Sequence, residues 1–186
     1  MKAPKEQVVL VDAQNRELGL ADKATVHTND TPLHRGFSLF IFNSRGQLLL
    51  QQRAMSKKTW PGVWSNSVCG HPAKAETAQA AAVRRANYEL GIALNSKDII
   101  VFEPSYMYRY EHKGVVEHEF CPVFVVQTDA KPKANADEVA ATRWVDWADF
   151  VAEVKQPNAY SEWCVEETGL LEKNPAFRQF YKGLRT

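Results

Sequence analysis

The sequence contains little cysteine, no long apolar run and almost no net charge. Its three cysteines, Cys69, Cys121 and Cys164, form an odd set without a disulfide framework, which favours a reducing, cytoplasmic setting. No stretch approaches the ~18 apolar residues of a membrane span, and no basic segment followed by an apolar one opens the chain. The formal net charge is +1. We therefore expect neither nucleic acid nor a membrane as a partner, and an anionic ligand would need a local basic cluster.

The remaining composition is that of an ordinary globular protein. Hydrophobic residues make up 45% and charged residues 24% of the 186 positions. The sequence has no internal repeat, low-complexity tract or linker that would divide it. Because this length suffices for a sizeable core, we predict a single domain that spans residues 1–186.

Residues 60–92 contain several candidates for catalytic and metal-binding side chains. This stretch opens with a rigid turn, Trp60-Pro61-Gly62, and then reaches Cys69-Gly70-His71-Pro72. Cys69 and His71 lie two positions apart, so in an extended backbone both side chains point to the same face. A thiol and an imidazole together can perform acid–base chemistry or hold a metal ion.

A helix is predicted to follow, with Thr77 as its N-cap and Gly91 as its stop. Arg85 and Glu89 are spaced i, i+4 and share one face of this helix. A carboxylate beside a guanidinium can bind a metal ion and a phosphate. It can equally be an ordinary surface ion pair, and the residues alone leave both interpretations open.

The rest of the chain predicts a mixture of strands and helices. Residues 8–18 indicate two strands around a turn at Gln14-Asn15, and residues 37–52 indicate a hairpin around a turn at 43–46. An aromatic strand is predicted over 99–110, with four rings on one side: Phe102, Tyr106, Tyr108 and Tyr110. Further strands are predicted over 115–127 and 138–145, and helices over 147–155, over 160–172 and from Pro175 onward.

Two carboxylates stand out in the strand predicted over 115–127. Glu117 and Glu119 lie two apart, so both point one way while His118 points the other. Two carboxylates among apolar neighbours are costly unless a positive charge lies between them. A metal ion would satisfy them, and a solvent-facing edge strand is an equally open explanation.

Histidines supply the other half of a possible metal site. His27 and His34, each taken alone, would be a solvated or core residue. Together with His71 and a pair of carboxylates, however, they suit a divalent ion of the transition-metal type.

Residues 70–92 resemble the Nudix box. The matching spacing is Gly70-x5-Glu76-x7-Arg84, followed by Glu89-x-Gly91-Ile92. Two metal-binding carboxylates of that box are missing, because Arg85 and Tyr88 stand where glutamates belong. A hydrolase that holds several divalent ions with clustered glutamates would be crippled by these changes.

The stretch SKKTWPGVWSNSVCGHP, residues 56–72, is similar to one branch of that superfamily, the type 1 isopentenyl diphosphate isomerases, and the likeness extends from about Val8 to Trp163. It implies an α+β fold, a Nudix-like α/β/α sandwich with a mixed central sheet. It also implies a metal-dependent, reversible 1,3-allylic proton shift that converts isopentenyl diphosphate into dimethylallyl diphosphate.

The resemblance further implies a role for each matching residue. Cys69 and Glu119 would be the proton-transfer pair, Tyr108 would support transfer on the Glu119 side, and Trp163 would face the hydrocarbon end of the substrate. Three imidazoles and two carboxylates would form a metal site: His27, His34, His71, Glu117 and Glu119. Glu89 and the Cys69 carbonyl would hold Mg²⁺ on the diphosphate, and four basic residues would bind the diphosphate directly: Lys23, Arg53, Lys57 and Arg85.

Several alternatives remain open at this point. Mn²⁺, Zn²⁺ and Mg²⁺ all suit the His/Glu site, and the protein could be a monomer or a weak homodimer. The second candidate function is a Nudix-type pyrophosphohydrolase acting on nucleoside diphosphate derivatives, which the residues Arg85 and Tyr88 disfavour. The third is a binding module without catalysis, which has no need for an acid and a base.

Overall fold

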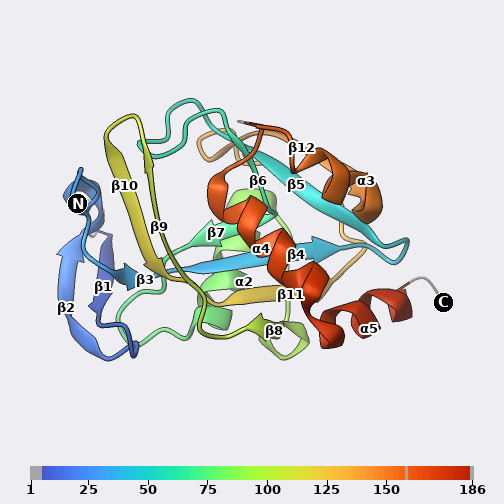
Figure 1. Cartoon of the computed structure of the whole chain (residues 1–186), viewed down its shortest axis with the longest axis horizontal. Helices are drawn as coiled ribbons and strands as arrows, with labels where there is room; N and C mark the ends of the chain where they lie inside the picture. Colours follow the sequence, from blue (N-terminus) through green and yellow to red (C-terminus); the bar gives the residue numbers. More distant parts are fainter. Residues whose placement is uncertain (1–5, 158, 185–186) are drawn as a thin grey trace.

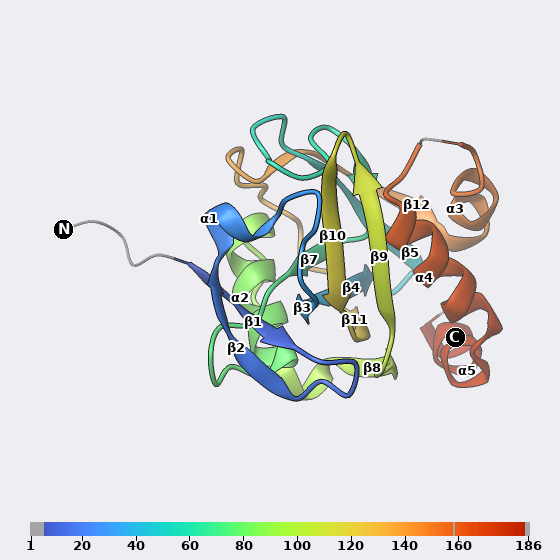
Figure 2. The ribbon, with the colours of Figure 1, turned by 60° about the vertical axis from the view of Figure 1, so that its left-hand side comes forward.

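The computed structural model describes residues 6–157 and 159–184, which form two mixed β-sheets with helices packed on them (Figure 1). The smaller sheet has the order β2 (Glu17–Asp22), β1 (Gln7–Val11), β3 (His34–Arg35), β10 (Val115–Phe120), β9 (Met107–His112). The larger sheet has the order β12 (Val139–Asp146), β5 (Gln47–Arg53), β4 (Phe37–Phe42), β11 (Val123–Gln127), β8 (Ile100–Glu103). Figure 2 shows β9 and β10 side by side in front of the larger sheet.

Helices cover both faces of the larger sheet. α2 (Ala78–Leu90) packs on one face, and three C-terminal helices pack on the other: α3 (Trp147–Glu153), α4 (Glu162–Lys173) and α5 (Pro175–Leu184). β4 is buried along its whole length, because Leu39 and Ile41 join the core under α2 while Phe40 and Phe42 join the core under α3 to α5. A strand buried on both faces is apolar throughout rather than alternating. The predicted α+β class and Nudix-like sandwich are confirmed.

The expected helix after the Cys-Gly-His segment is α2. The Thr77 side chain accepts a hydrogen bond from the Ala80 backbone amide at 3.1 Å, and Gly91 ends the helix with φ +63°. Both ends therefore follow the capping chemistry that the sequence predicts. Two short elements complete the set: α1 (Lys23–Val26) after β2 and a 3₁₀ turn, η1 (Ser96–Asp98), after α2.

The hairpin predicted over 37–52 forms, but its strands separate just beyond the turn. β4 and β5 pair only at Phe42 and Leu48, and two short strands enter the gap: β6 (Trp64–Ser65) pairs with β5, and β7 (Val68–Gly70) pairs with β4. The buried Ser67 hydroxyl bridges the opening, because it accepts from the Ile41 amide at 2.8 Å and donates to the Leu49 carbonyl at 2.5 Å. This gap places Cys69 and His71 in the middle of the fold.

Two sequence-based strand predictions are wrong in the same way. Residues 115–127 form β10 and β11, which belong to different sheets, and residues 99–110 likewise divide into β8 and the first part of β9. Between β10 and β11 the chain passes through Cys121 and Pro122, and proline cannot donate to a strand ladder. The rings of Tyr106, just before β9, and of Tyr108 and Tyr110 within it do contact one another along one side as expected, whereas Phe102 packs on Phe177 instead.

The other predicted elements form near their expected places. Of the two strands expected within 8–18, the first is β1, whereas the second, β2, begins only at Glu17 and continues to Asp22. The strand expected over 138–145 is β12, and the three C-terminal helices are α3, α4 and α5. Among residues 6–157 and 159–184, no helix combines the length and apolar character needed to cross a membrane.

Candidate active site

A cavity of 630 Å³ collects side chains from both sheets and from α1 and α4. It brings together the sequence-predicted site residues except His34, which is fully buried, and Glu89, which lies behind Arg85. The predicted residues that line it are Lys23, His27, Arg53, Lys57, Cys69, His71, Arg85, Tyr108, Glu117, Glu119 and Trp163. Residues far apart in the sequence thus share one chamber.

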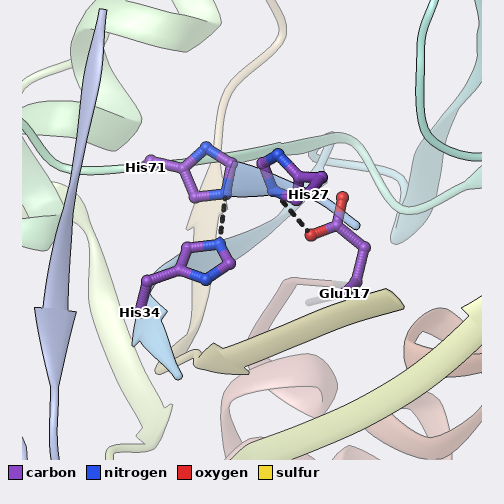
Figure 3. Close-up of side chains that lie close together, drawn as sticks. All are labelled: His27, His34, His71 and Glu117. Atoms are coloured by element: carbon purple, nitrogen blue, oxygen red, sulfur yellow. Dashed lines mark hydrogen bonds and ion pairs between the residues drawn. The ribbon is translucent and has the colours of Figure 1, made fainter. Parts of the chain in front are cut away.

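Three histidines and Glu117 form a compact cluster in one wall of the site (Figure 3). Each of His27, His34, His71 and Glu117 offers a ligand atom, and these atoms all lie within 4.8 Å of one another. Glu119 joins them, because its Oε1 atom lies 2.9 Å from His71 Nε2 and 3.8 Å from His34 Nε2. The two carboxylates come from the same face of β10, as their spacing predicts.

Backbone carbonyls orient two of the imidazoles. His34 Nδ1 lies 2.9 Å from the Pro32 carbonyl, and His27 Nδ1 lies 3.4 Å from the Lys23 carbonyl. A carbonyl oxygen only accepts, so Nδ1 of each ring carries the proton and Nε2 of the neutral ring presents a lone pair to the cluster. A backbone partner of this kind typically fixes the tautomer of a metal-binding histidine.

The cluster also leaves polar atoms without hydrogen bonds. His27 Nε2 and Glu117 Oε2 lie 3.1 Å apart, yet both are buried and neither has a hydrogen-bond partner, and His71 Nδ1 is likewise unpaired. Unpaired buried polar atoms are costly. A divalent ion among the imidazole nitrogens and carboxylate oxygens would satisfy His27 and Glu117, so the donor set fits such an ion.

Burial and neighbouring charges set the protonation of this cluster. Burial lowers the pKa of His71 to about 3. Burial and the charge of His71 lower the pKa of His34 to about 4. Burial raises the pKa of Glu117, but the neighbouring His27 outweighs burial and the net shift is downward. Burial and the charge of Glu117 together raise the pKa of Glu119. Burial lowers the pKa of His27 too, but Glu117 outweighs burial and raises it. His34 and His71 are thus held in the neutral form, which is the form that binds a metal.

Gly36 is a site residue that the sequence did not reveal. A β-carbon at this position would lie 1.8 Å from Glu119 Oε2, so only glycine lets the carboxylate occupy its place. Gly36 directly precedes β4, and nothing in its sequence neighbourhood marks it. The contact depends on β10, more than eighty positions away, and no local pattern could have indicated it.

Cys69 lies on β7 with two polar neighbours. Its Sγ atom lies 3.0 Å from Asn66 Oδ1 and 3.6 Å from Ser38 Oγ. Burial raises the pKa of the Cys69 thiol to about 12. The side chain therefore carries its proton at neutral pH and can donate it. Asn66 and Ser38 were not singled out from the sequence. Ser38 becomes a partner only through the pairing of β4 with β7, whereas Asn66 is only three positions away in the sequence.

Aromatic rings form another part of the cavity lining. The rings of Tyr108 and Trp163 stack with centroids 5.7 Å apart, and Trp60 packs edge-on to Trp163 at 5.0 Å. The Trp163 indole nitrogen donates to Ser65 Oγ at 3.1 Å, and the Arg53 guanidinium lies 5.8 Å from the Trp163 ring. Trp163 is thus fixed in orientation, and its polar edge is satisfied within the fold.

Basic residues also line the cavity. Arg85 donates to Glu89 at 2.8 Å and to Glu138 at 3.0 Å, and Lys57 also pairs with Glu138. Glu138 was not identified from the sequence, because it lies in the segment predicted as the start of a strand. The Arg85 and Glu89 pair is buried rather than exposed, which removes the ordinary surface interpretation.

Arg85 and Tyr88, which replace two glutamates of the Nudix box, contact each other in the structure. Arg85 occupies a buried position against two carboxylates, and the Tyr88 ring, half exposed, lies 5.1 Å beneath its guanidinium. Glu89 has both oxygens engaged, by Arg85 and by Gln51 at 3.2 Å. A cation therefore replaces one of the carboxylates that a metal-clustering hydrolase would require.

Comparison with known proteins agrees with this geometry. The NUDIX domain family matches residues 32–163. An isopentenyl-diphosphate Delta-isomerase of Saccharopolyspora erythraea is 49% identical over 176 residues, covering 92% of this chain and 90% of the relative. One of Klebsiella pneumoniae is 41% identical over 182 residues, covering 97% and 98%.

Solved structures give the same fold at lower sequence identity. A crystal structure from Deinococcus radiodurans has a TM-score of 0.70 at 21% identity, covering 88% of this chain and 98% of that one. A MutT protein from Methanosarcina mazei has a TM-score of 0.58 at 19% identity, covering 77% and 97%. These structures show the fold. The family match and the two curated relatives make the chain a member of the NUDIX domain family and, within it, of the isopentenyl-diphosphate Delta-isomerases.

Proposed function

We propose that this protein interconverts isopentenyl diphosphate and dimethylallyl diphosphate by adding one proton and removing another. One observation carries the proposal: the Cys69 thiol from β7 and the Glu119 carboxyl from β10 line the same cavity, together with aromatic and basic side chains. The aromatic side chains would contact a hydrocarbon tail, and the basic ones would bind a diphosphate. The names of the relatives support the same substrates.

Cys69 and Glu119 would form the acid–base pair. Adding a proton to C4 of isopentenyl diphosphate gives a tertiary carbocation at C3, and removing a proton from C2 then leaves the double bond between C2 and C3. One group supplies the first proton and the other accepts the second, so the two exchange roles when the reaction runs backward. Tyr108 is paired with Glu119 across β9 and β10, and its side chain interacts with the Glu119 carboxyl, which supports a role in proton transfer on the Glu119 side.

Trp163 would stabilise the cation through the negative face of its ring. Such a contact contributes about 2 kcal/mol or more when it is desolvated. Trp163 is 2% exposed, Tyr108 is 7% exposed, and Trp60 packs behind Trp163. These rings therefore also exclude water, which would otherwise trap the cation as an alcohol.

The basic side chains would bind the diphosphate. Lys23, Arg53, Lys57 and Arg85 all line the cavity. Arg85 and Lys57 share Glu138 as an ion-pair partner, which keeps both cations beside the same part of the cavity. We assign Glu89, with the Cys69 carbonyl, to a Mg²⁺ ion carried by the diphosphate. Substrate binding would then exchange some of the present Arg85 contacts for phosphate oxygens.

The His/Glu cluster would hold a divalent ion through three imidazoles and two carboxylates: His27, His34, His71, Glu117 and Glu119. When bound, the ion would supply positive charge that compensates the two buried carboxylates. Glu119 belongs to both this cluster and the acid–base pair, so its position at the substrate would depend on the cluster. Mn²⁺, Zn²⁺ and Mg²⁺ all remain compatible with these donors.

An isotope experiment tests the proposal directly. Purified protein with isopentenyl diphosphate and Mg²⁺ in deuterated water should yield deuterium-labelled dimethylallyl diphosphate, detected by NMR. We expect Cys69→Ala and Glu119→Gln to lose turnover almost completely while circular dichroism shows a folded protein. Turnover retained by either variant would overturn its assigned role. Release of a mononucleotide from nucleoside diphosphate derivatives, with no isomerisation, would favour the pyrophosphohydrolase instead.

We also infer that the chain acts as one domain, residues 1–186, in the cytoplasm, as a monomer or weak homodimer. Both main apolar clusters share the larger sheet, which supports a single cooperative unit. Light scattering after size-exclusion chromatography over a range of concentrations would measure the oligomeric state.

A further inference from the structure

Trp60 is a buried residue that contacts the aromatic lining of the active site without lining that cavity itself. Its ring packs edge-on to Trp163, with centroids 5.0 Å apart, and stacks on the ring of His112 at 5.3 Å. Trp163 is the ring that the hydrocarbon end of the substrate would contact. The orientation of Trp60 therefore helps to fix the orientation of Trp163.

The backbone of Trp60 is strained. Its φ angle is +46°, in the left-handed region that bulky residues rarely adopt. Strain of this kind persists only where the surrounding structure fixes the residue, and it is typical of functional sites. Trp60 directly precedes Pro61 and Gly62, in the turn that leads to β6. The fold thus accepts an unfavourable backbone conformation at the residue whose indole contacts Trp163.

A hydrogen bond to Glu162 holds the Trp60 indole. The Trp60 indole nitrogen donates to Glu162 Oε2 at 2.6 Å, a short bond with a carboxylate acceptor. Glu162 is the first residue of α4 and immediately precedes Trp163. The start of one helix therefore carries both the acceptor for Trp60 and the ring against which Trp60 packs.

Packing does not surround the Trp60 ring completely. Trp60, His112 and Glu162 together line a second cavity, of 400 Å³. A ring that borders a cavity lacks packing partners on that side. A hydrogen bond is directional, so the bond to Glu162 can fix the indole where packing contacts are missing.

We propose that Glu162 is a positioning residue for the reaction: its side chain holds the Trp60 indole against Trp163 and so fixes the ring that faces the developing cation. The inference rests on the proposed isomerase function. Glu162 does not line the active-site cavity, so it acts through Trp60. Trp163 would contact the cation rather than the diphosphate. Loss of Glu162 should therefore lower kcat and leave KM almost unaltered.

Substitutions at positions 162 and 60 separate this role from a purely structural one. Glu162→Gln removes the charge but keeps an oxygen acceptor, so we expect kcat within about threefold of the wild type. Glu162→Leu removes the acceptor and should lower kcat about tenfold, the equivalent of one hydrogen bond, with KM within about twofold. Trp60→Phe keeps an aromatic ring without the N–H group and should lower kcat at least as much. The double variant Trp60→Phe/Glu162→Leu should be no slower than Trp60→Phe, because Glu162 acts only through Trp60.

Glu172→Leu is the matched control on the same helix. Glu172 also accepts a hydrogen bond from an indole nitrogen, that of Trp147. Trp147 packs on Phe40 and Phe42 and does not line the active-site cavity. The control variant loses the same kind of bond and should keep kcat within about twofold of the wild type. Melting temperatures of both leucine variants would show that they are folded.

Equal kcat for the glutamine and leucine variants at position 162 would overturn the inference, because the acceptor would then make no difference. A rise in KM in place of the loss of kcat, or a further loss of kcat in the double variant, would also overturn it. So would an unchanged kcat in Trp60→Phe, which remains informative if Glu162→Leu does not fold. An inactive wild type would instead refute the proposed function, so the two failures are distinguishable.

Discussion

A single missing side chain, at Gly36, determines where Glu119 can lie. Because a β-carbon there would come within 1.8 Å of Glu119 Oε2, we expect Gly36→Ala to displace the carboxylate from His71 and His34. The affinity for a divalent ion should fall by about 10-fold or more, as it does when the support of a ligand is lost. Isothermal titration with Mn²⁺ would measure the change.

The control for this variant is Gly169→Ala. A β-carbon at Gly169 meets nothing within 4 Å, and the residue lies inside α4. We expect unchanged Mn²⁺ affinity and slightly higher stability, by about 0.5–1 kcal/mol, because alanine favours a helix. If Gly36→Ala bound Mn²⁺ as well as Gly169→Ala does, the close approach of Glu119 would not matter for the site.

At the scale of elements, the separation of β4 from β5 depends on Ser67. Its buried hydroxyl satisfies the Ile41 amide and the Leu49 carbonyl where the two strands no longer pair. We expect Ser67→Ala to lower the free energy of unfolding by about 1–3 kcal/mol, because both backbone groups would stay buried without a partner. Urea denaturation would measure this loss.

Ser105→Ala gives the comparison for that measurement. Ser105 is exposed in the turn between β8 and β9, so its replacement should change the free energy of unfolding by less than about 0.5 kcal/mol. Equal stability of the Ser67 and Ser105 variants would show that the opening between β4 and β5 is held by other contacts.

Helix α4 carries a pH-dependent contribution to stability at Glu167. Burial raises its pKa, so the folded protein holds this proton more tightly than the unfolded chain does. The contribution is full below the ordinary pKa of 4.5 and is lost progressively as the pH rises above it. Glutamine does not titrate. We therefore expect Glu167→Gln to gain stability relative to the wild type between pH 5 and pH 8, by up to about 1.4 kcal/mol per pH unit.

Thermal unfolding of both proteins at several pH values would check the sign. The charges of Glu119 and Glu166 raise the pKa of Glu167, as burial does. Neither of these acids therefore changes the expected direction. A stability difference that stays constant from pH 5 to pH 8 would contradict a neutral Glu167.

At the scale of the whole molecule, the His/Glu cluster links the two sheets. His34 and Glu119 pair across β3 and β10 of the smaller sheet, while His71 follows β7 of the larger one. A bound ion should therefore stabilise the entire fold, by about 2.7 kcal/mol at a free concentration of 100 times Kd. We expect chelator treatment to remove activity and lower the melting temperature, and divalent ions to restore both.

His71→Gln is the companion variant for that experiment. Without the His71 imidazole, added Mn²⁺ should raise the melting temperature much less than it does in the wild type. Full activity in protein verified to be free of metal by mass spectrometry would refute the five-ligand site.

The sequence by itself determined the local features of this protein. The ends of α2, the shared direction of Glu117 and Glu119 and the hairpin turns depend on residues only a few positions apart, which capping and strand alternation govern. The family followed from the segments around Cys69 and Glu89, because their spacing is specific. The chemical assignments for the site residues stay predictions until the variants are measured.

Only the tertiary structure decided which distant groups meet. The division of residues 115–127 between two sheets, the need for glycine at position 36 and the contact of Ser38 with Cys69 all arise from long-range pairing. The tertiary structure also determines which groups are buried. Burial makes the Glu167 carboxyl and the Cys69 thiol hold their protons. No short sequence pattern records the solvation of a side chain, since solvation depends on everything that packs around it.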